Sequence, residues 1–362
     1  MIRSQKKIGA VLIFAIVFLG ALFSGKYLNV GMLPNENVDV QLIKCAYFST
    51  ISLIIYAVLI KLGASVYSSS VFSVFIPFIP YFAETGNWDQ LKTFIPALLT
   101  MYCIWCVLLR KKKNIISIWC INLFINALCD QEYLCISLLI LICVTIICKK
   151  SVDSRTWKIL LGLTCSVLIG WVVLNGIVLR DGLYSLSDIS ENIKKTKADT
   201  LRVIELFLPV SNHRIGVFSL IRKQYDSVFG VSGENNTKCI GGFLSLFYLY
   251  GIIMIFIRKK DSSMIKKVAY YAGILNVALI LAAAEGGLGV LLAMLGVRLT
   301  SYNNFFSYIL SNTLIMSAIV LDCILDNIKI CRKIEKYDKL IKISISVLII
   351  MCVLYDVTPL NY

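Results

Sequence analysis

Carboxylate side chains occur in short polar segments that separate long apolar runs. Glu36 and Asp39 lie in the first of these segments, and Asp89 lies in the second. A third segment, Asp130-Gln131-Glu132, adds further acids. A carboxylate near an acceptor hydroxyl can take its proton as a general base. We expect these acid-bearing segments to frame a polar cavity, with the alternative that their carboxylates are ordinary acids of surface loops.

A second set of polar residues lies in the longest segment outside the apolar runs, Arg180–Ile240. The chain's one histidine, His213, is followed directly by Arg214, and Arg222 and Tyr225 come shortly after it. These side chains are hydrogen-bond donors of the kind that bind a phosphate or a diphosphate. We expect them to line a binding site for such a group. The alternative is that His213 is a hydrogen-bonded structural residue.

A glycine-rich stretch, Gly286–Gly289, precedes the short apolar stretch Val290–Val297. Glycine allows a tight turn, and free N–H groups at the start of the following helix attract anions. The alternative is a pair of helices that pack through these glycines. The flanking residues that we expect to bind substrate are Glu285, Arg298, Tyr302 and Asn303.

Apolar runs of about 15–20 residues recur along the whole chain, and they must position these polar residues. Hydrophobic residues make up 58% of the 362 residues, charged residues only 16%, and the mean hydropathy is +0.81. A soluble domain of this length has too little interior for so much apolar surface, and in lipid each backbone segment must satisfy its own hydrogen bonds. The sequence therefore predicts an all-α, polytopic membrane protein with about eleven transmembrane helices and one re-entrant or interfacial segment. The predicted spans are Ile8–Ser24, Ile43–Val58, Ser69–Phe82, Phe94–Leu109, Ile115–Cys129, Tyr133–Cys148, Ile159–Leu179, Gly241–Ile257, Val268–Ala284, Asn304–Leu321 and Ile341–Tyr355.

The positions of lysine and arginine predict the orientation of these helices, because basic residues concentrate in short cytoplasmic loops. With the N-terminus in the cytoplasm, all the basic clusters fall on that face and the C-terminus is exoplasmic. The net charge of +15 is then mainly an orientation signal, and no nucleic-acid partner is expected. The clusters are the N-terminus, Arg110–Lys113, Lys149–Lys158, Arg258–Lys267 and Lys329–Lys342.

This topology divides the chain into three parts. Residues 1–178 form an N-terminal transmembrane bundle, and residues 179–240 form a long exoplasmic loop with an amphipathic helix at Glu191–Phe207. Residues 241–362 form a C-terminal bundle that contains the re-entrant, glycine-rich segment. Cys103 and Cys106 have the spacing of a redox or zinc motif, but they lie inside an apolar span. We therefore expect no metal and no cofactor.

The polar segments of the C-terminal half resemble a family of bacterial integral-membrane sugar transferases or translocases of the GT-C type. The similarity begins with Leu208-Pro209, followed by His213-Arg214-Ile215, Tyr225 and Gly233-Glu234-Asn235, and continues at Gly241 and Gly242. It also includes the Gly286–Gly289 turn, Arg298 and Tyr302-Asn303. Asn304 stands where the family pattern has a second arginine, and Asp39 is the nearest counterpart of the family's catalytic acid.

The resemblance implies transfer or translocation of a sugar carried on polyprenyl phosphate, in the synthesis of capsule, O-antigen or wall glycans. In such a mechanism the candidate catalytic residues are Asp39, Glu36 and Asp89, one of which would act as the base, and Arg214, Arg222 and Arg298 would stabilise the phosphate. The implied location is the bacterial inner or plasma membrane, among membrane lipid and other membrane proteins of polysaccharide assembly. Three alternatives stay open: a polymerase of glycan repeat units, a non-catalytic transporter or flippase of lipid-linked sugars, and a truncated member of the family.

Overall fold

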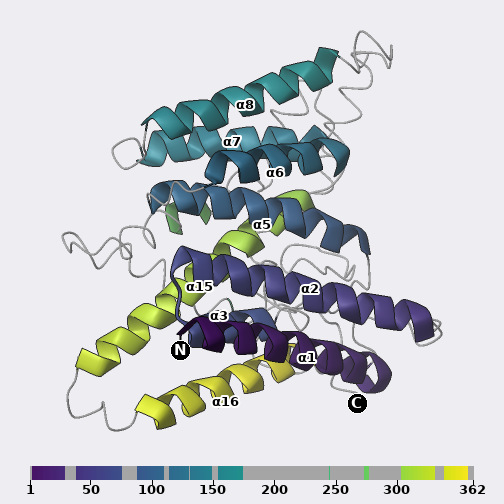
Figure 1. The fold of residues 1–362 in the computed structure, drawn as a ribbon, viewed down its shortest axis with the longest axis vertical. Coiled ribbons are helices and arrows are strands. Elements are labelled where there is room, and N and C mark those ends of the chain that lie inside the picture. Colours follow the sequence, from purple (N-terminus) through teal and green to yellow (C-terminus); the bar gives the residue numbers. More distant parts are fainter. Residues whose placement is uncertain are drawn as a thin grey trace, which may run out of the picture. The chain divides into compact units, whose positions relative to one another are not determined.

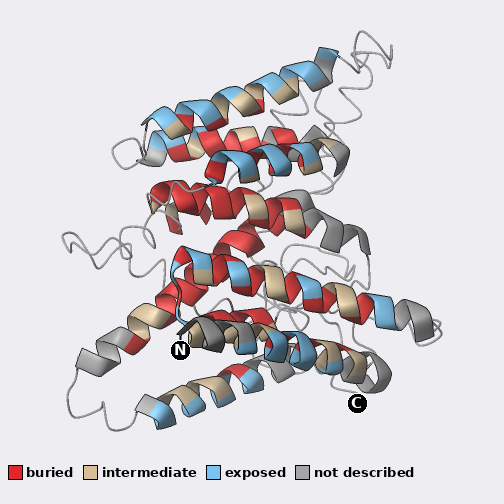
Figure 2. Cartoon of the chain, in the orientation of Figure 1, coloured by how far each residue is buried: buried red, intermediate tan, exposed pale blue. Residues whose placement is uncertain are grey.

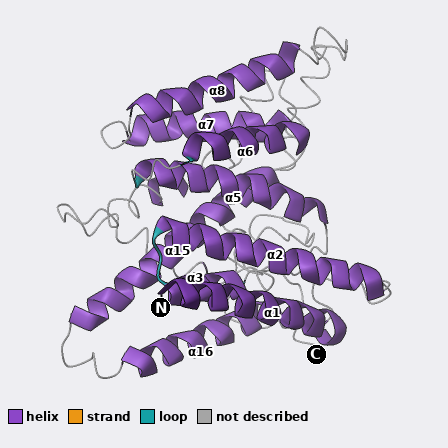
Figure 3. Ribbon diagram, in the orientation of Figure 1, coloured by secondary structure: helices purple, strands orange, loops and turns teal. Residues whose placement is uncertain are grey.

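The computed structural model describes residues 2–28, 38–75, 88–109, 114–129, 131–148, 154–173, 244, 273–276, 303–330 and 338–357. All regular secondary structure in these ranges is helical, as Figure 3 shows, which confirms the predicted all-α class for this part of the chain. The long loop, the amphipathic helix and the glycine-rich segment lie outside the described residues. So do most residues of the predicted spans Gly241–Ile257 and Val268–Ala284.

The longer described helices each overlap one predicted apolar run (Figure 1). They often extend beyond the run, because polar residues at its ends continue the same backbone hydrogen-bond pattern. The helix that starts at Ile2 and ends at Leu28, for example, includes the predicted span Ile8–Ser24. The helices are α1 (Ile2–Leu28), α2 (Val38–Leu62), α3 (Val66–Val74), α5 (Trp88–Leu108), α6 (Ile115–Cys129), α7 (Gln131–Cys148), α8 (Ser154–Val173), α15 (Asn303–Ile330) and α16 (Asp338–Val357).

Two segments of these helices are long and apolar enough to cross a membrane. They are Leu42–Leu62 of α2 and Ser307–Leu325 of α15, and 56% and 83% of their most apolar windows are buried inside the protein. Central helices of soluble proteins share this length and composition, so membrane crossing is a proposal that we take up below. Figure 2 shows how buried residues dominate the middle of α15, whereas α1, α8 and α16 expose many of theirs.

The described helices belong to two compact units, and α15 contributes to both. Unit 1 contains α1, α2, α3, α16 and the part of α15 from Leu314 onward. In it, α1 packs against α2 and α3, and α2 packs against α3. Unit 2 contains the rest of α15 up to Thr313 together with α6, α7 and α8, which pack against one another, and α5 from Asp89 onward.

A tight corner joins α2 to α3 in unit 1. Gly63 has a φ of 103°, a value that favours glycine because a side chain would clash with the backbone. Its N–H donates to the carbonyl of Ile60, and the N–H of Ala64 donates to that of Leu59, which is the Schellman arrangement at a helix end. Ser65 then caps α3 by accepting a hydrogen bond from the N–H of Ser68. These local signals start α3 before Ser69, the predicted start of the span.

Helices α1 and α2 approach each other closely at Gly9, and this contact gives a testable prediction. A Cβ atom at Gly9 would meet the Tyr56 hydroxyl oxygen at 2.8 Å, and that hydroxyl is buried without a hydrogen-bond partner among the described residues. We expect Gly9→Ala to lower the free energy of unfolding by about 1–3 kcal/mol through overpacking. Tyr56→Phe removes both the clash and the unpaired hydroxyl, so it should stabilise the protein and reduce the cost of Gly9→Ala.

Thermal unfolding of the purified protein, the two single variants and the double variant measures this coupling. Gly170→Ala in α8 is the matched control, because a Cβ there would meet nothing within 4 Å. This control should be neutral or stabilising by about 0.5–1 kcal/mol. Equal costs of Gly9→Ala with and without the Tyr56 hydroxyl would contradict the predicted clash.

Candidate functional site

Some of the residues predicted from the sequence to act chemically lie at the starts of helices. Asp39 is in the first turn of α2, Asp89 is in the first turn of α5, and Asn303 is the first residue of α15. Their side chains are outside the described part of the structure. The other predicted residues lie entirely outside it, and they are Glu36, His213, Arg214, Arg222, Tyr225, Glu285, Arg298 and Tyr302.

Unit 2 contains a group of fully buried polar side chains that the sequence analysis did not single out. We call Thr100, Asn122, Asn126, Ser137 and Tyr308 the open amide network. The amide of Asn122 donates to Thr100 Oγ1 over 2.7 Å, and that of Asn126 donates to Ser137 Oγ over 3.3 Å. The Ser137 hydroxyl lies 3.4 Å from Thr100 Oγ1 and 3.3 Å from the Tyr308 hydroxyl. Among the residues that the structure describes, the amide oxygens of Asn122 and Asn126 have no hydrogen-bond partner.

A second buried network in the same unit uses both ends of its amides, and we call it the closed amide network. The indole N–H of Trp105 donates to Asn312 Oδ1 over 2.8 Å. The Asn312 amide donates to Asn276 Oδ1 over 2.6 Å, and the Asn276 amide donates to Thr313 Oγ1 over 3.0 Å. The Thr313 hydroxyl donates to the carbonyl of Ile309 on its own helix. Because its amide groups are paired, this network specifies how the helices pack.

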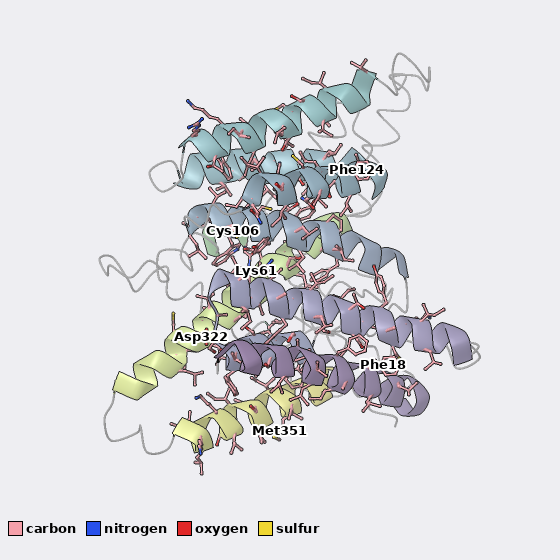
Figure 4. The ribbon with its side chains drawn as sticks, in the orientation of Figure 1. Phe18, Lys61, Cys106, Phe124, Asp322 and Met351 are labelled. Carbon is pink, nitrogen blue, oxygen red and sulfur yellow. The ribbon has the colours of Figure 1, made fainter. Side chains whose placement is uncertain are left out.

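Unit 1 contains a cluster of an aspartate and two serines at the start of α3. One carboxylate oxygen of Asp322 accepts hydrogen bonds from the hydroxyls of Ser65 and Ser68, and both oxygen–oxygen distances are 2.5 Å. Its other oxygen accepts from the backbone N–H of Ser65 over 2.6 Å. Figure 4 labels Asp322 on α15, half-buried beside α3. A negative charge at a helix start is stabilised by the helix dipole, so this carboxylate ties α15 to the α2–α3 corner.

A second set of contacts in unit 1 joins α3 to α16. The Tyr67 hydroxyl donates to the carbonyl of Lys342 over 2.8 Å and lies 2.8 Å from the Ser346 hydroxyl. The Lys342 ammonium lies 6.0 Å from the centre of the Tyr67 ring. A cation at this distance from an aromatic face is weakly attracted to it. These contacts hold the start of α16 against α3, so their role is structural.

The described side chains include no group of three or more His, Cys, Asp or Glu that is arranged to hold a metal ion. Cys103 and Cys106 of α5 are buried beside Trp105, so they pack as small apolar residues. The open amide network offers only neutral groups, which are amides and hydroxyls. The acids and cations of the predicted transferase site lie elsewhere in the chain.

The sequence contained a usable signal for these clusters. Asn122, Asn126, Ser137 and Asn312 are polar residues inside predicted apolar spans, and Asp322 directly follows one. Polar and ionisable residues inside such spans are functional candidates. The sequence alone does not say which of them face one another, because their partners come from other helices.

The comparisons with known proteins leave the family unassigned. No family model matches the chain. No curated protein and no solved structure matches it either, so the likeness to sugar transferases of the GT-C type remains a prediction from short motifs.

Proposed function

We propose that this chain is a polytopic protein of the bacterial cell membrane that transfers or translocates a polyprenyl-phosphate-linked sugar at its exoplasmic face. The membrane part of the proposal is supported by the distribution of polar and apolar side chains on the helices. The sugar part is supported by the positions of the acids in the chain and by the sequence resemblance.

Helix α6 supports the membrane part most directly. Its exposed side includes Ile116, Ile121 and Phe124, with 41%, 57% and 65% of their surfaces accessible. Its buried side includes Asn122 and Asn126, both without accessible surface. A surface helix of a soluble protein has the reverse arrangement, with apolar residues inside and polar residues outside. An apolar outer face with amides inside suits a helix that is surrounded by lipid.

Other helices repeat this pattern. Val11 and Leu19 of α1, Ile146 of α7 and Ile169 of α8 are each more than 60% exposed. Met351 of α16, labelled in Figure 4, is 64% exposed. Soluble monomers rarely expose so many large apolar side chains along their helices. Exposed hydroxyls often bond to their own helix, as Ser166 does to the carbonyl of Gly162, so they need no water.

The positions of the acids suit a site at the outer face. With the N-terminus in the cytoplasm, the starts of α2, α5 and α15 are all exoplasmic, and these starts contain Asp39, Asp89 and Asn303. In this proposal Asp39 removes the proton from an acceptor hydroxyl, and Arg214 and Arg298 stabilise the leaving polyprenyl phosphate. Glu36 and Asp89 are the alternative bases. Translocation without chemistry would use the same cations only to bind the headgroup.

Reporter fusions test the topology on which this proposal depends. A reporter that is active only outside the cytoplasm should be active after Asn235 and silent after Lys112, Lys259 or Glu335. The reason is that the basic clusters hold the short loops in the cytoplasm, whereas the long loop lies on the other side. An inactive reporter after Asn235, with the fusion protein present at normal amounts in membranes, would place the long loop in the cytoplasm. That result would contradict the proposed exoplasmic site.

Arginine-to-lysine variants test the phosphate contacts. Arg214→Lys and Arg298→Lys should each weaken retention of a labelled polyprenyl-linked sugar about ten- to a hundredfold, because an ammonium does not reproduce a bidentate guanidinium contact. Retention and glycan product are measured in membranes at matched expression. Lys158→Arg in α8 is the matched control, because it exchanges one basic residue for another in a cluster that is predicted to lie on the cytoplasmic face. Normal product from both Arg214→Ala and Arg298→Ala would rule out this phosphate site.

A further inference from the structure

We propose that the open amide network of unit 2 is a binding site for a small monovalent cation, and Na⁺ is the probe with which we test it. This inference goes beyond the proposed sugar function and does not depend on it. It rests on the buried oxygen atoms of Thr100, Asn122, Asn126, Ser137 and Tyr308.

The first step is the pair of amide oxygens that accept no hydrogen bond. Asn122 and Asn126 lie one turn apart on the buried side of α6, and their nitrogens donate into the network. Their oxygens have no partner in the described part of the chain, and each unpaired buried acceptor costs about 1–3 kcal/mol. Exchanging the oxygen and nitrogen of either amide would leave a buried NH₂ group unpaired instead. Rotation of the amides therefore does not pair all the polar atoms of the network. A bound group that interacts favourably with the two amide oxygens does.

The closed amide network shows that unpaired amides are not general in this unit. Asn312 and Asn276 are also fully buried, yet the oxygen of each amide accepts a hydrogen bond and the nitrogen of each amide donates one. Both networks include residues of α5 and α15. The difference is therefore specific to the side of α6 that presents Asn122 and Asn126.

The second step is the chemistry of the atoms in the open amide network. Its acceptor atoms are amide and hydroxyl oxygens, and no carboxylate, thiolate or basic side chain is among its members. Divalent Ca²⁺ and Mg²⁺ depend on carboxylates, and Zn²⁺ prefers thiolate and imidazole ligands. Neutral carbonyl oxygens, in contrast, can replace the hydration shell of a monovalent cation. An anion would meet the negative ends of the same dipoles and be repelled.

The third step is the size of the ligand. The side chains of all these residues have no accessible surface, so a ligand among them is enclosed by protein. A bare ion satisfies this condition, whereas a sugar or a lipid headgroup is too large for fully buried side chains to surround without separating the helices. A buried water molecule is the competing occupant, because water donates hydrogen bonds to unpaired oxygens. The two occupants differ in whether the protein responds to the cation supplied.

The experiment measures thermal unfolding of the full chain in detergent or nanodiscs at constant ionic strength. NaCl is exchanged stepwise for choline chloride, and binding of radioactive ²²Na⁺ is measured on the same preparation. We expect the unfolding midpoint to rise with Na⁺ and saturate, as linkage requires for a ligand of the folded state. Equal midpoints in NaCl and choline chloride, without saturable ²²Na⁺ binding, would overturn the proposal and leave a buried water as the occupant.

Ser137→Ala removes one ligand oxygen with little change of volume and should lower the affinity for Na⁺ about tenfold or more. Asn126→Leu removes an amide oxygen and should have at least the same effect. Ser311→Ala is the matched control, because Ser311 is a fully buried serine of unit 2 whose hydroxyl bonds to the carbonyl of Ser307. It should keep the Na⁺ response of the unaltered protein. An unchanged response in Ser137→Ala would also overturn the proposal, even if Asn126→Leu failed to fold.

Discussion

Asp39→Asn is expected to abolish the formation of glycan product while binding of the polyprenyl-linked sugar stays near normal. The carboxamide keeps the size of the side chain but cannot accept the proton of an acceptor hydroxyl. A variant that loses only the base should therefore lose turnover rather than affinity. General-base catalysis alone contributes about 10²–10⁴-fold to a rate, so the loss should be far larger than that from one arginine contact.

The measurement is glycan product in membranes together with retention of labelled polyprenyl-linked sugar, at matched expression. Asp89→Asn and Glu36→Gln are measured in parallel, since they are the alternative bases. Asp322→Asn serves as the control for a carboxylate whose hydrogen bonds are structural, and it should lower stability without a specific loss of turnover. Unchanged product from Asp39→Asn, with the arginine variants inactive, would place the base elsewhere or favour translocation without catalysis.

Asn312→Leu is expected to cause the largest loss of stability among single changes in unit 2. Leucine has nearly the same size, but it leaves the indole N–H of Trp105 and the amide oxygen of Asn276 without their partner. Each buried group left unpaired costs about 1–3 kcal/mol, so we expect a loss of about 2–6 kcal/mol in the free energy of unfolding. Trp105 is one of the largest fully buried side chains, which leaves little room for water to replace the lost contact.

A double-mutant cycle with Trp105→Phe separates this hydrogen bond from simple loss of packing. Once phenylalanine has removed the indole donor, Asn312→Leu leaves one fewer group unpaired and should cost less. Ser166→Ala, at an exposed position on α8, is the control and should change stability by no more than about 0.5 kcal/mol. Thermal unfolding in one detergent measures all the variants. Additive costs of the two changes would mean that the Trp105–Asn312 contact does not stabilise the fold.

The helices themselves could be predicted from local sequence. A run of apolar residues that is shielded from water favours the α-helix, because the backbone of a helix satisfies its own hydrogen bonds. The predicted run Ile115–Cys129 coincides with α6, and Tyr133–Cys148 lies within α7. Helix ends were less predictable where capping decides them. Ser65 starts α3 ahead of the predicted run because its side chain bonds to the N–H of Ser68.

The acids proposed for catalysis were also found locally, because each of them interrupts an apolar pattern. The sequence places Asp39 and Asp89 next to apolar runs, and the structure adds that each lies in the first turn of a helix. It does not describe their side chains, nor the segment with His213 and Arg214. That these acids and cations lie close together is thus a prediction from the sequence resemblance, and the variants described above test it.

The pairing of polar residues was decided by tertiary structure alone. Asn312 and its partner Trp105 are 207 residues apart, and Asp322 is 257 residues from Ser65. On α6, the sequence determined that Asn122 and Asn126 share one side of a helix, since they are four residues apart. Only packing against α5 and α7 determined that this side is buried and that the amide nitrogens find partners while the oxygens do not. The physical reason is that backbone hydrogen bonds and apolar periodicity act over a few residues, whereas a side-chain hydrogen bond depends on which distant helix is brought to face it.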